Sequence, residues 1–455
     1  MNAAVDAGPG AGLTLRFPEQ YEPKYAPVFE SLREHGYVVI PAILTPEECT
    51  ALQTEVWAWL ESLGMGILRD DVDTWKPQQW ISMIHGIIKG YGIGQQEFMW
   101  KVRTNKRVQR VFRKLWGTKQ LVCSFDGMSL HRPKEFVPSI KGATKRANAY
   151  KPTDWMHVDH TPENKNESVQ SFVSLYENTV EDGCLMVYDG SHKLFDEFFA
   201  LKQVKPLNNW YRYTPEDHVW MQERGCKLVR VAAPIGSMVL WNSKTVHSSA
   251  YAMEDRARPT MRMVLYACMV PRRCISAKTQ ITRRNFVMNG FTSSHSPITP
   301  KKNEVVPRHP MLKGEEAKEA KKFHHGLLRK RKWEVFASVH EVDQLLYGRV
   351  TKLVPFGCFV QVGEGIEGLV HISEMSALHV ETPEQVMTPG DSVWVKLLDL
   401  DLGRRRLSLS IKQVTEGGYL SAHYLQMLGV DELFNTDQLL FIKFEDNRFC
   451  VDDVP

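Results

Sequence analysis

The sequence Trp155-Met156-His157-Val158-Asp159 places two metal-binding side chains two residues apart in a run that is typical of a β-strand. Residues i and i+2 of a strand point to the same face, so His157 and Asp159 can hold one ion together. Thr245-Val246-His247-Ser248-Ser249 supplies a second imidazole from a later strand. Two imidazoles and one carboxylate are the ligand set of non-haem Fe(II) oxygenases, which keep positions open for a co-substrate and dioxygen. The pattern predicts an iron site.

The composition is that of a soluble protein with more than one domain. The chain has 455 residues, of which 43% are hydrophobic, and its formal net charge is +4. This length suggests two or three domains with packed cores. No run reaches the roughly 18 apolar residues of a membrane span. The eight cysteines form no Cys-x-x-Cys pair, which argues against a disulfide framework or a zinc site. We therefore expect a cytoplasmic protein without a membrane partner; a nuclear location is the alternative.

Helical patterns precede a long series of strand patterns. Thr45 can cap a helix over 46–62, with Pro46 at its first position and Glu48 completing a capping box. Other helices are predicted over 25–34 and 96–116. From Leu121 onward, short strands are separated by turn signals, which favours a sandwich or barrel over βαβ units. These strands are predicted over 121–129, 156–159, 169–176, 184–188, 227–232, 237–241 and 262–270.

The composition also divides the chain into segments. Residues 306–342 are rich in charge and predict a basic, solvated helical linker. We expect a disordered N-terminus over 1–20, an all-β domain with flanking helices over 21–305, a second all-β domain over 343–413 and an acidic tail over 414–455.

The first domain resembles the phytanoyl-CoA dioxygenase family of Fe(II)- and 2-oxoglutarate-dependent oxygenases. The resemblance covers roughly residues 30 to 272. It rests on Gly36-Tyr37-Val38-Val39-Ile40-Pro41, on Gly183-Cys184-Leu185 and on Gly190-Ser191-His192-Lys193, which lie in the expected order around the ligand pattern. It implies a double-stranded β-helix, a jelly-roll of the cupin-like kind, in which His157, Asp159 and His247 hold iron.

The resemblance also implies an arginine that pairs with the distal carboxylate of 2-oxoglutarate. A guanidinium offers a planar carboxylate two parallel hydrogen bonds, whereas lysine is a point charge. Arg262 opens a strand-like run, while Arg258 has the more usual offset from His247, so both stay candidates. Ser174 is a further candidate for the pocket, or a core residue. His160 is expected to be structural or to support the metal ligands, and His192 is expected to be structural.

The second all-β segment resembles the RNA-binding repeat of ribosomal protein S-one, a five-stranded OB-fold barrel. The resemblance rests on 348–360, 365–373, 390–396 and 404–410. It implies an RNA-binding face formed by Phe356, Phe359, His371, Asp401 and Arg406. Exposed aromatic rings can stack on bases and arginines can follow phosphates, which suits single-stranded RNA. The alternative is a barrel that only docks a protein.

Together these patterns predict a dioxygenase that uses Fe(II), 2-oxoglutarate and dioxygen to hydroxylate an unknown substrate, releasing succinate and CO2. Its barrel would bring it to single-stranded RNA or to a ribosome-associated target. Two alternatives remain open. One is an RNA-binding protein with an inactive oxygenase scaffold, and the other is a hydroxylase of a small molecule or acyl-CoA.

Overall fold

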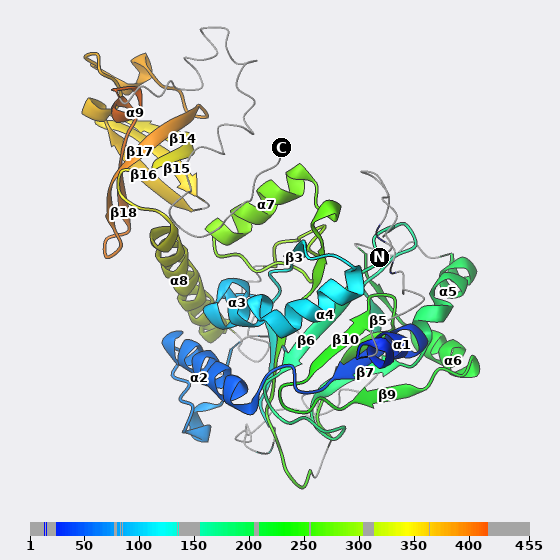
Figure 1. Cartoon of the computed structure of the whole chain (residues 1–455). Coiled ribbons are helices and arrows are strands. Elements are labelled where there is room, and N and C mark those ends of the chain that lie inside the picture. The colour runs from blue at the N-terminus through cyan, green and yellow to red at the C-terminus, as the bar shows by residue number, and fades with distance from the viewer. Residues whose placement is uncertain are drawn as a thin grey trace. The chain divides into compact units, whose positions relative to one another are not determined.

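The computed structural model describes residues 13, 15, 24–76, 80–81, 83, 85–133, 135, 155–203, 209–253, 256–303, 314–363 and 365–416. The chain divides into two compact units, with the boundary in the sequence between Leu328 and Arg329. Figure 1 shows the whole chain. In the described part, no helix is both long and apolar enough to cross a membrane.

The first unit is built on two β-sheets. The larger sheet has the order β1-β10-β6-β12-β4-β2 and the smaller one β8-β5-β11-β7-β9, while β13 and β3 form a separate ribbon. The strands are β1 (Tyr37–Ile40), β2 (Ile87–Ile88), β3 (Leu121–Cys123), β4 (Met128–His131), β5 (His157–Val158), β6 (Val169–Ser174), β7 (Cys184–Tyr188), β8 (Tyr211–Arg212), β9 (Leu228–Val231), β10 (Met238–Asn242), β11 (His247–Ala250), β12 (Arg262–Tyr266) and β13 (Met269–Pro271).

Alternation along the strands separates the inner and outer faces of these sheets. On β6, Phe172 packs with Leu185 and Val187 of the smaller sheet, whereas Val173 faces the core shared with the helices. The expected mainly β fold with flanking helices, a double-stranded β-helix, is confirmed. Its metal-site strands β5 and β11 lie in the smaller sheet.

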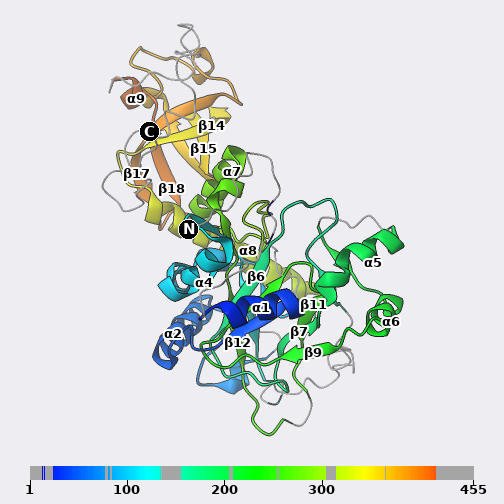
Figure 2. The same ribbon diagram turned by 45° about the vertical axis from the view of Figure 1, so that its right-hand side comes forward.

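Helices cover the outer faces of both sheets. The outer core of the larger sheet includes residues of α2, α3 and α4, and that of the smaller sheet includes residues of α5 and α6, which lie on the opposite side (Figures 1 and 2). The helices of this unit are α1 (Ala26–His35), α2 (Pro46–Ser62), α3 (Glu97–Thr104), α4 (Lys106–Trp116), α5 (Phe195–Lys202), α6 (Pro215–Glu223) and α7 (Ala277–Met288).

Helix α2 has the predicted bounds, and Thr45 and Glu48 form the predicted capping box. The single helix predicted over 96–116 is wrong. It breaks at Asn105, whose side chain accepts hydrogen bonds from the amides of Arg107 and Val108 and thereby starts α4. Because such a cap stabilises a new helix start, it outweighs the continuous apolar stripe. The strands predicted over 121–129 and 262–270 are likewise each split in two, between β3 and β4 and between β12 and β13.

The second unit is a closed barrel with the order β14-β15-β16-β18-β17, as expected for a five-stranded OB-fold. Its strands are β14 (Leu345–Val354), β15 (Gly357–Gly363), β16 (Ile366–His371), β17 (Ser392–Asp401) and β18 (Arg406–Ser410), and α9 (Lys412–Glu416) follows. Helix α8 (Gly314–Val339) runs through the expected linker and is part of both units. Its last turns are not merely solvated, because Trp333 and Phe336 are buried in the barrel core.

The two ends of the chain are only partly described. Leu13 and Leu15 are buried, and their amides donate to the side chains of Asn166 and Glu167, which differs from the expected disorder over 1–20. The other residues of that segment lie outside the described residues, as does the acidic tail beyond Glu416.

Candidate metal centre

The two histidines of the predicted site are cross-strand partners. His157 on β5 lies opposite His247 on β11. Nδ1 of His157 is 3.0 Å from the carbonyl oxygen of Trp155, and Nδ1 of His247 is 2.8 Å from that of Thr245. A carbonyl can only accept, so both Nδ1 atoms carry the proton and both Nε2 atoms present a lone pair. This is the tautomer that binds a metal through Nε2.

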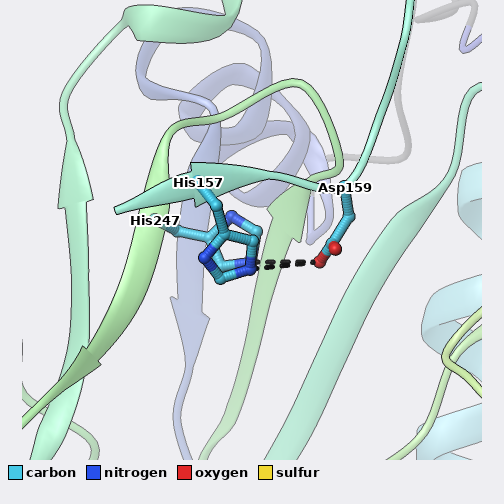
Figure 3. A group of neighbouring side chains, drawn as sticks. All are labelled: His157, Asp159 and His247. Atoms are coloured by element: carbon cyan, nitrogen blue, oxygen red, sulfur yellow. Dashed lines mark ion pairs between the residues drawn. The ribbon is translucent and has the colours of Figure 1, made fainter. Parts of the chain in front are cut away.

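Asp159 completes a compact group of donors. Its Oδ2 lies 3.6 Å from Nε2 of His157 and 3.4 Å from Nε2 of His247 (Figure 3). One ligand atom from each of the three residues lies within 4.8 Å of the others. Ligand atoms about 2.1 Å from an ion and at right angles to one another are about 3 Å apart. The donor types and their spacing therefore fit an Fe(II) ion.

The surroundings of Asp159 fix its position and charge. Nε2 of Gln170, from the larger sheet, donates to Oδ2 at 2.9 Å, and Nδ2 of Asn209 donates to the backbone carbonyl at 3.0 Å. Burial raises the pKa of the Asp159 carboxyl, but the neighbouring His295 and His157 and the hydrogen bonds to His157 and His247 outweigh burial and hold the pKa well below its usual value. Burial and the neighbouring His247 lower the pKa of His157. An ionised carboxylate beside a neutral imidazole is the protonation state that binds a metal.

Arg262 lies on the inner face of the larger sheet and reaches the strand of His247. It is 2% exposed, and its Nη1 donates to Oγ of Ser129 at 2.6 Å and to Oγ of Ser249 at 3.3 Å. Ser249 follows His247 by two residues on β11 and so shares its face. The ring of Phe172 lies below the guanidinium, 5.4 Å away. In the part of the chain that the structure describes, no carboxylate pairs with Arg262.

The other arginines after His247 are placed differently. Arg258 is exposed in a bend. Arg256 is buried, but it is ion-paired with Asp182 and Glu135. The hydroxyl of Ser174 is 2.9 Å from the carbonyl oxygen of Tyr176 and 3.2 Å from Oδ1 of Asn178. Of Arg258, Ser174 and Arg262, only Arg262 has a described side-chain contact to β11, the strand of His247.

The sequence analysis did not predict His131 as a site residue. In the structure His131 is the cross-strand partner of Arg262. Burial and the charge of Arg262 lower its pKa to about 3. Its Nδ1 is buried without a hydrogen-bond partner among the described residues. A Cβ on Gly183 would lie 2.8 Å from that Nδ1 and 3.4 Å from Cδ of Arg262. This explains the glycine in the Gly183-Cys184-Leu185 motif, because a side chain there would crowd both residues. The alternation Met128-Ser129-Leu130-His131 could have revealed His131 as inward-facing.

His295 was also missed and comes from a loop after α7. Its Nδ1 is 3.9 Å from Oδ2 of Asp159, and it lines a small cleft together with Asn164, Ser168 and Asn209. Only folding brings this loop to the metal ligands. Ser293 anchors the loop through hydrogen bonds with the backbone of Phe125. The expected structural roles of two other histidines fit their contacts. His160 packs its ring against Phe195, and Nε2 of His192 is 2.9 Å from the carbonyl oxygen of Arg33.

The residues expected to bind RNA lie on the outside of the barrel. Phe356 is 51% exposed in the turn before β15, and the pairing of Gly357 with His371 places His371 beside it. Nζ of Lys352 lies 4.4 Å from the ring centre of Phe359. Asp401 and Arg406 face each other in the β17–β18 hairpin, farther along the wall from His371. The structure thus places His371 beside Phe356, and Asp401 opposite Arg406.

Comparison with known proteins agrees with both units. The family model of phytanoyl-CoA dioxygenase (PhyH) matches residues 32–259, and that of the S1 RNA binding domain matches residues 339–412. Ava biosynthesis cluster protein O of Aspergillus versicolor is 29% identical over 302 residues, which are 64% of this chain and 93% of that protein.

Small ribosomal subunit protein bS1 of Mycolicibacterium smegmatis is 61% identical over 84 residues, which are 18% of each protein. The chain thus spans less than a fifth of that relative. Among solved structures, EctD from S. alaskensis with bound Fe aligns with a TM-score of 0.39 and 16% identity, covering 57% of this chain and 81% of that one. The PhyH match covers half of the sequence, so the chain belongs to the phytanoyl-CoA dioxygenase family, the non-haem iron oxygenases, and carries a C-terminal S1 RNA-binding domain.

Proposed function

We propose that this chain is an Fe(II)- and 2-oxoglutarate-dependent hydroxylase that works in the cytoplasm on RNA or a ribosome-associated target. The balanced reaction takes substrate, 2-oxoglutarate and dioxygen to hydroxylated substrate, succinate and CO2. One observation carries the proposal. His157, Asp159 and His247 form a compact group of metal donors, and Arg262 contacts Ser249 on the strand that carries His247.

The chain's residues have separate tasks in this reaction. His157, Asp159 and His247 would hold iron on one side and leave its other side open. Arg262, fixed by Ser129 and Ser249, would bind the distal carboxylate of 2-oxoglutarate in a buried setting, where a charge-assisted hydrogen bond is strong. Trp155 packs on His157 and helps to exclude water. Iron, when bound with 2-oxoglutarate and dioxygen, supplies the oxidising chemistry that inserts oxygen into a C–H bond.

The S1 domain supports RNA as the partner. Its exposed Phe356 and the cation beside Phe359 suit a single strand of nucleic acid. The relatives of this domain include ribosomal protein bS1, which supports a ribosome-associated target. A second candidate is a hydroxylase of a small molecule, favoured by the likeness to a biosynthesis cluster protein over 64% of this chain.

One experiment tests whether the chain is an active 2-oxoglutarate-dependent enzyme. Purified protein is given Fe(II), 2-oxoglutarate and dioxygen, and succinate is measured with and without candidate RNAs. We expect succinate from the wild type and none from His157→Ala. Mn(II) binding by calorimetry gives a readout independent of turnover, and His157→Ala should abolish it. If the wild type binds RNA but binds no metal and forms no succinate with any substrate, the proposal is wrong. The chain would then be an RNA-binding protein with an inactive oxygenase scaffold.

A further inference from the structure

An exposed tryptophan lies directly before the edge strand β8, beside a metal ligand. Arg212 of β8 lies directly opposite His157 of β5, so the two side chains share a face of the smaller sheet. Trp210 precedes Arg212 by two residues and therefore points the same way. Its ring centre is 5.7 Å from that of His157, yet Trp210 is 41% exposed. A large apolar ring is thus left open to solvent beside the metal ligand His157.

Two cations lie near the stacked rings beside His157. Burial lowers the pKa of His85, and His157, Lys89 and Arg212 lower it further, so Lys89 and Arg212 act on the same small region. His85 stacks face to face on Trp155 at 4.2 Å, and Trp155 stacks on His157 at 4.9 Å. Arg212 is exposed and Lys89 is half-buried. Aromatic faces and positive charge therefore lie together beside the metal centre.

Trp220, on the outer face of the same sheet, is a structural tryptophan with which Trp210 can be compared. Trp220 of α6 is covered by the guanidinium of Arg224, 3.8 Å from the ring centre. Arg224 in turn donates to Glu197 at 2.9 Å, so its charge is paired. Trp210 and Arg212 have the same side-chain types but face the metal centre. This pair of tryptophans provides a matched control.

We propose that Trp210, Arg212 and Lys89 form a nucleotide platform that holds one nucleotide of a single-stranded RNA at the metal centre. Trp210 stacks on the base, and the two cations bind the flanking phosphates. Single-strand binding sites combine these two features, since every base has a π-face and every link carries a negative charge. The proposal rests on the proposed function and names RNA as the substrate itself rather than a tether.

Coenzyme A also contains a base and phosphates, so it is the competing source of the same chemistry. The test uses full-length protein loaded with Mn(II) and 2-oxoglutarate, in the Phe356→Ala/Phe359→Ala background that weakens the barrel. A fluorescent oligouridylate of 12 nucleotides is titrated by anisotropy at several salt concentrations, and coenzyme A is titrated in parallel.

We expect Trp210→Ala to weaken oligouridylate binding by about 5- to 100-fold, the loss of one stacked base. Arg212→Ala should reduce the salt dependence by about one phosphate contact. The controls Trp220→Ala and Arg224→Ala should bind like the parent. An oligouridylate affinity that is the same in all four variants overturns the platform. Loss of coenzyme A binding alone in Trp210→Ala overturns RNA as its occupant.

Failure of the platform is distinguishable from failure of the proposed function. Mn(II) binding and RNA-independent succinate formation by the parent report on the proposed function alone, because neither needs RNA. If both of these are present while oligouridylate binding ignores Trp210, only the platform is lost. If the parent itself binds no metal, the proposed function has failed first.

Discussion

The guanidinium of Arg262 and the hydroxyl of Ser249 link the two sheets, with Nη1 3.3 Å from Oγ. The larger sheet thereby delivers a cation to the strand that carries His247. Arg262 and His247 are thus both fixed to regular strands rather than to loops, which favours a constant geometry.

Replacing Arg262 by lysine should weaken 2-oxoglutarate binding without affecting the metal. A point charge cannot reproduce two parallel hydrogen bonds to a carboxylate, and we expect a loss of roughly 10- to 100-fold. Calorimetry of 2-oxoglutarate into Mn(II)-loaded protein measures it. The exposed Arg258→Lys is the control and should bind like the wild type. An equal loss in both variants would contradict the assignment of Arg262.

Removing the amide of Gln170 should lower the metal affinity. Gln170→Ala deletes the 2.9 Å hydrogen bond to Oδ2 of Asp159, and partners of this kind are worth about 10- to 100-fold in affinity. Gln53→Ala removes a half-buried side-chain amide, one that donates to the carbonyl of Leu175 far from the ligands. Mn(II) titration should separate the two variants, and an unchanged affinity in Gln170→Ala would show that Asp159 needs no such support.

Acidification should destabilise the fold through His131. Its pKa falls from an ordinary value near 6.5 to about 3 in the folded chain, because burial and Arg262 disfavour its charged form. The unfolded chain therefore binds one more proton between these values, and the free energy of unfolding falls as the pH falls through this window. The contribution reaches about 1.4 kcal/mol per pH unit. Melting temperatures between pH 7 and pH 4 should fall less steeply in His131→Gln than in the wild type.

RNA binding by the barrel should depend on the aromatic rings grouped near His371. Phe356→Ala should cost about 1–3 kcal/mol in affinity for single-stranded RNA, the energy of stacking one base. Tyr347 is 53% exposed against 51% for Phe356 and lies on β14, which makes Tyr347→Ala a matched control. Anisotropy with the full chain measures both. If Tyr347→Ala binds more weakly than Phe356→Ala, the binding face lies on a different wall.

The end of α8 should stabilise the barrel. Phe336 is 3% exposed in the barrel core, and its truncation to alanine should lower the free energy of unfolding by about 3–5 kcal/mol. Val339→Ala on the same helix serves as the comparison, because Val339 is 37% exposed and little is lost there. Chemical denaturation followed by circular dichroism reports the difference. Equal stability of the two variants would return the helix to the role of a solvated linker.

The sequence predicts local features better than contacts between distant segments. The capping box of α2 and the shared face of His157 and Asp159 follow from spacings of two or three residues. The break at Asn105 was missed because the apolar stripe continues across it, although the cap itself is local. Gln170 and His295 reach Asp159 from another sheet and from a later loop, so no spacing in the sequence reveals them.

The ring of each metal-site histidine is oriented by a hydrogen bond from its Nδ1 to the backbone carbonyl two residues earlier in the chain. The orientation of either ring therefore does not depend on the ion or on the other ring. An ion that arrives finds its ligands already turned toward it, and little of its binding energy is consumed in ordering them. Metal loading should then raise the melting temperature of the first unit in proportion to RT ln(1 + [metal]/Kd), as expected for a ligand that binds a finished fold.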